Sequence, residues 1–219
     1  MNRLLALLLV CSLACLHAAE RTVLCYGDSI TFATWKEQQV GDGNRWTDLL
    51  PKQVAGIRTV NVGKNGRTTE DVGGLKEALQ KNANPDVVIL LLGVNDLKGI
   101  ADGAAAAAAT TKRMAILLDT VRAAAPKAAI LLCAPLSINE QALTDYWKSK
   151  GFGSTTSAAL VALEISYQAL AVERKIGFVS LLKTVTPANI PDGVHPNQAG
   201  HGEIAAALAA AMAPQKSRK

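Results

Sequence analysis

Hydrophobic positions along the chain fall into short, continuously apolar runs that alternate with longer stretches of helical periodicity. Short apolar runs without polar alternation are typical of parallel strands that are covered on both faces. The pattern predicts five strands, at residues 22–26, 58–62, 86–92, 129–134 and 177–181, and five helices, at residues 45–54, 70–80, 104–124, 157–175 and 198–212. This β–α alternation predicts a doubly wound α/β fold, in which helices cover both faces of a parallel sheet.

The N-terminal segment has the layout of a secretory signal peptide. Residues 1–19 contain one cation, Arg3, then an apolar run, then the small pair Ala18-Ala19. We therefore expect a secreted or periplasmic protein. The apolar run is shorter than the roughly 20 residues that a membrane span needs, so we expect no membrane span. Neither Cys11 nor Cys15 follows the residues that a lipobox prefers, so we do not expect a lipoprotein anchor.

The rest of the chain has the length of one domain, which we place at residues 20–213. Residues 214–219 form a basic tail that we expect to be disordered. Without Arg3 and the three cations of this tail, the chain has 19 basic and 18 acidic residues, so the domain is nearly neutral. Such a balance gives little support to nucleic-acid binding. Cys25 and Cys133 lie in predicted strands, and we expect buried thiols there rather than a disulfide.

A serine follows the first predicted strand directly, in the sequence Gly27-Asp28-Ser29-Ile30-Thr31. Active sites of doubly wound folds lie outside the carboxyl ends of the strands, which is where Ser29 falls. A serine hydroxyl is a poor nucleophile unless a base, a group that orients the base and donors for an oxyanion surround it.

The candidate base is His195, in the turn Asp192-Gly193-Val194-His195-Pro196. Residues three apart in a tight turn can face the same side, so Asp192 can orient the imidazole while its other nitrogen faces Ser29. His201 is the rival base, and we interpret it as a capping or packing residue. A metal site of Asp192, His195 and His201 is conceivable but ranks far behind, so we expect no metal and no cofactor.

Two glycine- and asparagine-containing loops follow the second and third predicted strands. In residues 61–69 Gly66 can offer a backbone N–H, and in residues 92–96 Asn95 can offer a side-chain amide. With the N–H of Ser29 they would make three donors of an oxyanion hole. A phosphate-binding reading is disfavoured, because no glycine-rich phosphate loop is present and Asp28 would repel a phosphate.

These four blocks together resemble the SGNH branch of the GDSL esterases and lipases, from about residue 21 to residue 212. The blocks are Gly-Asp-Ser at the first strand, Asn-x-x-x-x-Gly at the second, Gly-x-Asn-Asp at the third and Asp-x-x-His near the C-terminus. The resemblance implies a three-layer α/β/α sandwich with a flavodoxin-like five-stranded parallel sheet. It also implies Ser29 as nucleophile, His195 as base, Asp192 as its orienting acid, and Ser29, Gly66 and Asn95 as oxyanion donors.

The residues around the blocks look similar to arylesterase, acyltransferase and carbohydrate acetylesterase members of that family. Trp35, Arg67 and Trp147 are the candidate substrate-binding residues, and residues 137–154 are the candidate substrate-shaping loop. This loop is too short and polar for a lipase lid, so we expect small acyl groups on a sugar, aryl or alkyl ester. A lysophospholipase- or thioesterase-type acylhydrolase, or a non-catalytic surface binding module on the same fold, are the alternatives. The oligomeric state is left open.

Overall fold

The sheet predicted from the apolar runs is present in the computed structural model, which describes residues 20–34 and 40–213. Its strands are β1 (Arg21–Gly27), β2 (Ile57–Asn61), β3 (Val87–Leu91), β4 (Ala129–Ala134) and β5 (Gly177–Ser180). All four strand pairs are parallel, and the order is β2-β1-β3-β4-β5. This is the flavodoxin-like order, in which β2 is added on one side of β1 and the later strands are added on the other, so the strand order reverses between β1 and β3.

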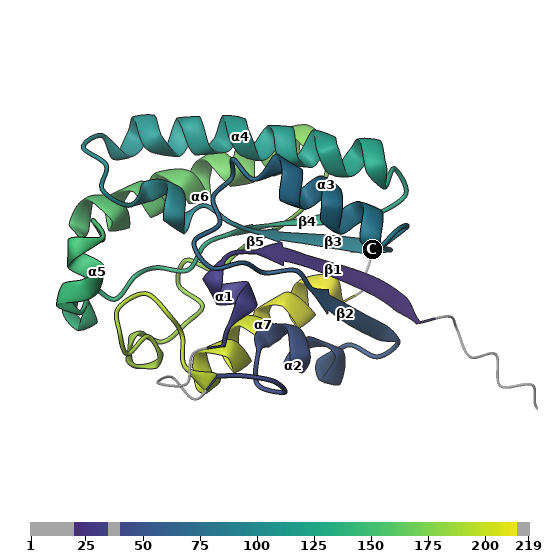
Figure 1. Cartoon of the computed structure of the whole chain (residues 1–219), viewed down its shortest axis with the longest axis horizontal. Helices are drawn as coiled ribbons and strands as arrows, with labels where there is room; N and C mark the ends of the chain where they lie inside the picture. The colour runs from purple at the N-terminus through teal and green to yellow at the C-terminus, as the bar shows by residue number, and fades with distance from the viewer. Residues whose placement is uncertain (1–19, 35–39, 214–219) are drawn as a thin grey trace, which may run out of the picture.

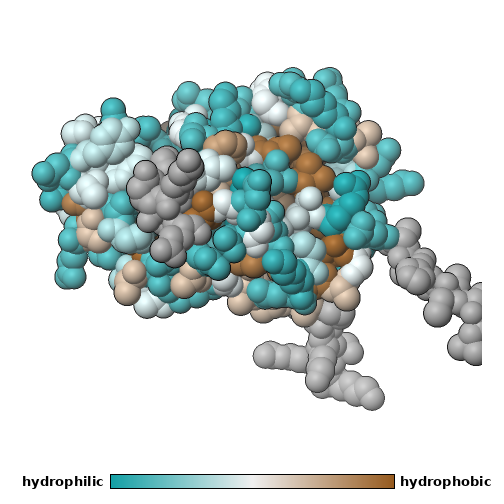
Figure 2. All heavy atoms as spheres, turned by 60° about the horizontal axis from the view of Figure 1, so that its bottom comes forward, coloured by the Kyte–Doolittle hydropathy of each residue, from teal (hydrophilic) through white to brown (hydrophobic). Residues whose placement is uncertain are grey.

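Helices cover both faces of this sheet and complete the three layers (Figure 1). On one face lie α3 (Val72–Lys81), α4 (Gly103–Ala124) and α6 (Ser154–Arg174), and on the other α2 (Trp46–Gln53) packs against α7 (Gln198–Met212). Figure 2 turns the α2 and α7 side forward and shows a mainly hydrophilic surface with hydrophobic patches between the polar groups. Both faces of the sheet are thus removed from water, which explains why the strands read as continuous apolar runs.

The predicted elements are confirmed, with ends that differ by three residues or fewer. The sequence pattern missed the shortest helices: α1 (Ser29–Phe32), α5 (Asp145–Ser149) and the 3₁₀ helices η1 (Val94–Leu97), η2 (Glu140–Ala142) and η3 (Pro187–Asn189). Helices of one turn are too short to show a 3.6-residue period, so hydrophobic patterning cannot detect them. The segment that we expected to be a loop, residues 137–154, therefore contains η2 and α5.

The centre of the core is β3, all of whose residues are buried. Cys25 on β1 and Cys133 on β4 are free and buried, and β3 separates the two strands, so the prediction of packed thiols is confirmed. Within the part of the chain that the structure describes, one helix, α6, has the length and apolar composition of a membrane span. It packs against α4, β4 and β5 in this fold.

Candidate functional site

Ser29 is placed by a tight turn at the carboxyl end of β1. The carboxylate of Asp28 accepts a hydrogen bond from the Ile30 N–H at 2.9 Å and so caps α1, whose first residue is Ser29. A Cβ atom at Gly27 would lie 2.0 Å from the Thr31 Oγ1 atom, so only glycine allows the strand to enter the helix here. The turn points the serine hydroxyl out of the sheet edge.

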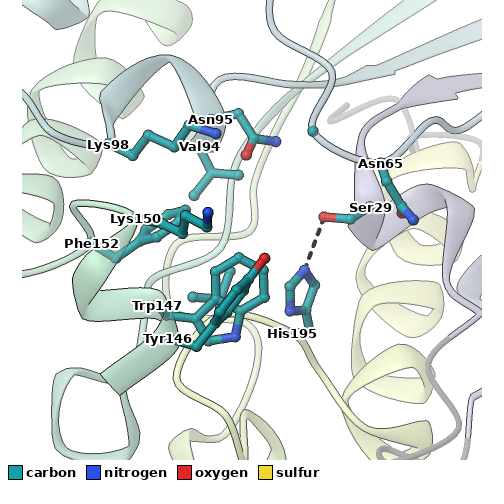
Figure 3. A pocket seen from close by; sticks show the side chains of 12 residues that line it. Ser29, Asn65, Val94, Asn95, Lys98, Tyr146, Trp147, Lys150, Phe152 and His195 are labelled. Atoms are coloured by element: carbon teal, nitrogen blue, oxygen red, sulfur yellow. Dashed lines mark hydrogen bonds between the residues drawn. The ribbon is translucent and has the colours of Figure 1, made fainter. Parts of the chain in front are cut away.

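The predicted serine, histidine and aspartate meet at that edge. The Ser29 Oγ atom lies 3.0 Å from His195 Nε2, and His195 Nδ1 lies 2.9 Å from Asp192 Oδ2 (Figure 3 draws the first contact). A carboxylate oxygen can only accept, so Nδ1 carries the proton and Nε2 is free to accept from the serine hydroxyl. A hydroxyl, an imidazole and a carboxylate in this geometry can form an activated nucleophile.

Among the described residues, four donors hold the Asp192 carboxylate. The backbone N–H groups of Val194 and His195 donate to Oδ1 at 2.8 and 2.7 Å, while Oδ2 receives the His195 Nδ1–H and the Trp147 Nε1–H, the latter at 2.8 Å. Burial by itself would raise the pKa of Asp192, but the hydrogen bonds from His195 and Val194 outweigh burial and lower it. Asp192 is therefore kept ionised and fixed in direction.

Trp147 comes from α5, and its ring packs beside the imidazole of His195 with 4.8 Å between the ring centroids. The tryptophan was expected to bind substrate, and the structure does place it in the cavity wall. Its indole N–H bond to Asp192 was missed, because the two residues lie 45 positions apart and nothing in the sequence signals the contact.

The loop after β2 is held against α1 and brings Gly66 to the cavity. Asn61 donates from Nδ2 to the Thr31 carbonyl at 2.6 Å and accepts from the Gly63 N–H at 2.9 Å. A Cβ atom at Gly63 would lie 2.2 Å from the Phe32 nitrogen, so a larger residue would push this loop away from α1. Both Gly66 and Ser29 then line the same cavity.

A second connection joins this loop to the one after β3. Asn95 donates from Nδ2 to the Arg67 carbonyl at 3.2 Å, which leaves the second amide hydrogen available. The neighbouring Asp96 accepts from the Thr69 N–H at 3.1 Å and from Arg113 Nη2 at 3.1 Å. Sequence reasoning did not single out Asp96, although it directly follows Asn95 in the third block. The two loops with the predicted oxyanion donors are thus fixed to one another.

The side chain of Arg67, which we expected to bind substrate, contacts other parts of the protein. Its guanidinium donates to the carbonyls of Gly27 and Val62, pairs with Asp71 at 2.9 Å and lies 4.0 Å from the centre of the Tyr26 ring. The side chain is 8% exposed and is not among the groups that line the cavity. The geometry thus gives Arg67 the task of joining the ends of β1 and β2, and does not support substrate binding by its side chain. Trp35 lies outside the described residues.

The cavity next to Ser29 has a volume of about 360 Å³ and is walled by residues of five different segments (Figure 3). Three of its aromatic groups come from residues 137–154, as expected for a segment that shapes the substrate site. The lining residues are Ser29, Asn65, Gly66, Val94, Asn95, Lys98, Tyr146, Trp147, Lys150, Phe152, Val194 and His195.

His201 has the capping role that we expected. It is buried, and its Nδ1 atom accepts the Trp46 N–H at 3.2 Å at the start of α2. Burial lowers the pKa of His201 to about 3 and keeps the ring neutral. The structure does not bring His201 to Ser29, and no group of three metal-ligating side chains is found among residues 20–34 and 40–213.

Burial of Asp28 makes the stability of the fold depend on pH. Burial raises the pKa of this carboxyl to about 6, and the Ile30 N–H and His195 oppose the shift only partly. The folded state therefore binds a proton more tightly than the unfolded chain, so stability falls as pH rises from about 4 to about 6. We expect Asp28→Asn, which keeps a capping oxygen, to raise the free energy of unfolding at pH 8 by up to about 3 kcal/mol, and by much less at pH 4.5.

Denaturant unfolding of both proteins at several pH values measures this difference. Asp71→Asn is the control of opposite sign, because hydrogen bonds from Gly74 and Arg67 outweigh burial and lower the pKa of Asp71. The ionised Asp71 carboxylate stabilises the fold above its unfolded pKa, and this effect is lost in acid, so Asp71→Asn should lower stability at pH 8 more than in acid. An Asp28→Asn protein that loses stability equally at both pH values would contradict the buried-carboxyl interpretation.

Known proteins match this chain in sequence pattern and in fold. The family model described as "GDSL-like Lipase/Acylhydrolase family" matches residues 25–202. A comparison with curated proteins finds no match. Among solved structures, a carbohydrate acetylesterase family member from Sinorhizobium meliloti is 26% identical with a TM-score of 0.74, over 87% of this chain and 96% of that one.

Two further structures support the fold alone. The aryl esterase of M. smegmatis is 23% identical with a TM-score of 0.74, over 87% of this chain and 97% of that one. A lipolytic protein of the G-D-S-L family from Veillonella parvula is 18% identical with a TM-score of 0.66, over 86% and 96%. Because the family model covers most of its length, this chain belongs to the GDSL-like lipase/acylhydrolase family and is a carboxylic ester hydrolase of the SGNH type.

Proposed function

We propose that this protein is a secreted serine esterase that hydrolyses esters of small acyl groups, with Ser29, His195 and Asp192 as its catalytic residues. The observation that carries the proposal is the chain of contacts from Ser29 Oγ to His195 Nε2 at 3.0 Å and from His195 Nδ1 to Asp192 at 2.9 Å, beside a cavity. Export stays a prediction from residues 1–19, which lie outside the described residues.

In the first step, Ser29 Oγ bonds to the ester carbonyl carbon while its proton passes to His195 Nε2. The oxygen of the tetrahedral intermediate becomes negative, and the N–H groups of Ser29 and Gly66 and the Asn95 amide are its proposed donors. Ser29 is the first residue of α1, so its N–H has no acceptor within the helix. The bond to the alcohol then breaks, and His195 returns the proton to the leaving oxygen.

Water repeats the sequence on the acyl-enzyme. His195 takes a proton from the water as its oxygen attacks the acyl carbon, and the bond to Ser29 breaks with return of that proton. Asp192 stabilises the imidazolium in both steps without taking the proton.

The size of the cavity supports small acyl groups. About 360 Å³ lies near the lower end of the range of ligand pockets, and an acetyl ester of a sugar or phenol would fill much of it. The S. meliloti relative is a carbohydrate acetylesterase family member, which agrees with this choice. Trp147 is the proposed wall of the substrate site.

A fluorophosphonate probe tests the nucleophile. It should label the wild type at the peptide that contains Ser29, and Ser29→Ala should not be labelled. Ser149→Ala, which removes an exposed serine of α5 at the same rim, is the matched control and should label normally. Equal labelling of Ser29→Ala and wild type would show that another residue is the nucleophile.

A panel of p-nitrophenyl esters from acetate to palmitate, with acetylated sugars beside it, tests the acyl group. We expect kcat/KM to be highest for the short esters. If palmitate is the best substrate by a wide margin, the lysophospholipase- or thioesterase-type alternative replaces the small-acyl proposal.

A further inference from the structure

Two lysines, Lys98 and Lys150, stand in the wall of the candidate active-site cavity. Lys98 follows η1 and Lys150 follows α5, and both enter the cavity from the side opposite Ser29 (Figure 3). None of the twelve lining residues is an aspartate or glutamate. This end of the cavity therefore carries positive charge that no lining residue in the described part of the chain neutralises.

The backbone holds the two lysines next to one another. The Gly99 N–H donates to the Gly151 carbonyl at 2.8 Å, directly after each lysine. A Cβ atom at Gly151 would lie 2.5 Å from the Gly99 Cα, so the two segments approach this closely only with a glycine at position 151. Like charges brought together repel one another, and a bound anion would relieve that repulsion.

Neither lysine has a carboxylate partner among the residues that the structure describes. The amine of Lys150 lies over an aromatic ring, with Nζ 5.1 Å from the centre of the Tyr146 ring. Two other exposed lysines do have such a partner: Lys148 on α5 pairs with Asp145 at 3.7 Å, and Lys81 pairs with Glu77 at 2.6 Å. Lys98 and Lys150, which have no carboxylate partner among the described residues, thus both line the cavity.

We propose that the ester substrate carries an anionic group on its alcohol part, and that Lys98 and Lys150 bind this group. The inference rests on the proposed function, because it takes Ser29 as the point of attack. Since the proposed acyl group is small, the end of the cavity opposite Ser29 receives the alcohol. Phe152, Trp147 and Val94 line the same cavity, so an apolar or ring-shaped alcohol with a carboxylate at its far end fits the distribution of charge.

Two acetyl esters that differ in charge test this inference. The probes are 4-acetoxybenzoate, which is anionic, and 4-acetoxybenzamide, which is its neutral counterpart. The ratio of their kcat/KM values is measured for the wild type, for Lys98→Gln, for Lys150→Gln and for the double variant. Comparing the ratio between proteins cancels the intrinsic reactivity of the two esters.

We expect each single replacement to lower the ratio about 3- to 5-fold and the double replacement to lower it roughly 10-fold, as for charge pairs near a protein surface. The wild-type ratio should also fall as ionic strength rises from about 0.01 M to about 1 M, because the Debye length shrinks from about 30 to about 3 Å. Lys148→Gln makes the same change in net charge on α5 outside the cavity and should leave the ratio unchanged.

The outcomes separate this inference from the proposed function. Suppose that Ser29 is needed for hydrolysis of both esters but the ratio of their kcat/KM values is the same in the wild type and the double variant. This result overturns the proposal of an anionic substrate and leaves the esterase proposal intact. If Lys148→Gln lowers the ratio as much as the cavity variants do, the proposal of an anionic substrate is also overturned, because net charge alone then explains the preference. Absence of Ser29-dependent hydrolysis of either ester overturns both proposals.

Discussion

Asp192→Asn is expected to lower kcat for acetyl esters by ~10⁴-fold with little change in KM. Because Oδ1 of Asp192 accepts two backbone N–H groups, the amide oxygen of an asparagine must take that position. The amide nitrogen is then forced to the Oδ2 position, where it donates to His195 Nδ1. The imidazole must carry its proton on Nε2, and it can no longer accept one from Ser29.

The tryptophan contact gives this prediction a control. In Asp192→Asn the new amide nitrogen would face the Trp147 Nε1–H, which lies 2.8 Å from Oδ2 in the wild type, so two donors would oppose one another. Adding Trp147→Phe removes this conflict and should recover stability in thermal unfolding. It should not recover kcat, because the tautomer stays wrong. Wild-type turnover in Asp192→Asn would show that Asp192 does not orient His195.

The sheet and its helices could be predicted because their patterns are repeated along many residues. Fully buried strands such as β3 give apolar runs, and α7 gives fifteen residues of helix that were predicted with their correct ends. The order of the strands came from the resemblance, because all parallel arrangements give the same apolar runs.

Much of the site could also be predicted, because its residues are adjacent in sequence to strand ends. Ser29 follows β1, and Asp192 and His195 lie three residues apart in one turn, so local spacing was enough to suggest their contact. The contacts between distant segments could not be predicted in this way. Trp147 reaches Asp192 from α5, a one-turn helix without a periodic signal.

Arg67 shows contacts of another kind that the sequence did not reveal. A cation in a loop at the sheet edge suggested substrate binding, but the nearby carbonyls of Gly27 and Val62 need donors once the strands end. A sequence shows the charge of a side chain but not which backbone groups lack a partner. The same difference in information explains why Asp96, which pairs with Arg113, was not singled out.

Asn95→Ala is expected to lower kcat by ~10²–10³-fold with KM nearly unchanged. The Asn95 amide uses one hydrogen to reach the Arg67 carbonyl at 3.2 Å, and the other is available for the oxyanion. The carbonyl oxygen of the ester gains its full negative charge only after Ser29 attacks. Loss of this donor therefore raises the activation barrier more than it weakens substrate binding. The fold should lose no more than about 1 kcal/mol, the usual contribution of one partly exposed hydrogen bond.

Asn65→Ala separates this effect from a general disturbance of the cavity. Asn65 lines the same cavity and belongs to the same residue type, but its side chain lies on the far side of Ser29 from Asn95 (Figure 3). We expect its kcat to stay within a few-fold of wild type, while both variants unfold at similar denaturant concentrations. If Asn95→Ala keeps full kcat, or if both variants lose activity equally, the amide of Asn95 is not an oxyanion donor, and the N–H groups of Ser29 and Gly66 must stabilise the charge alone.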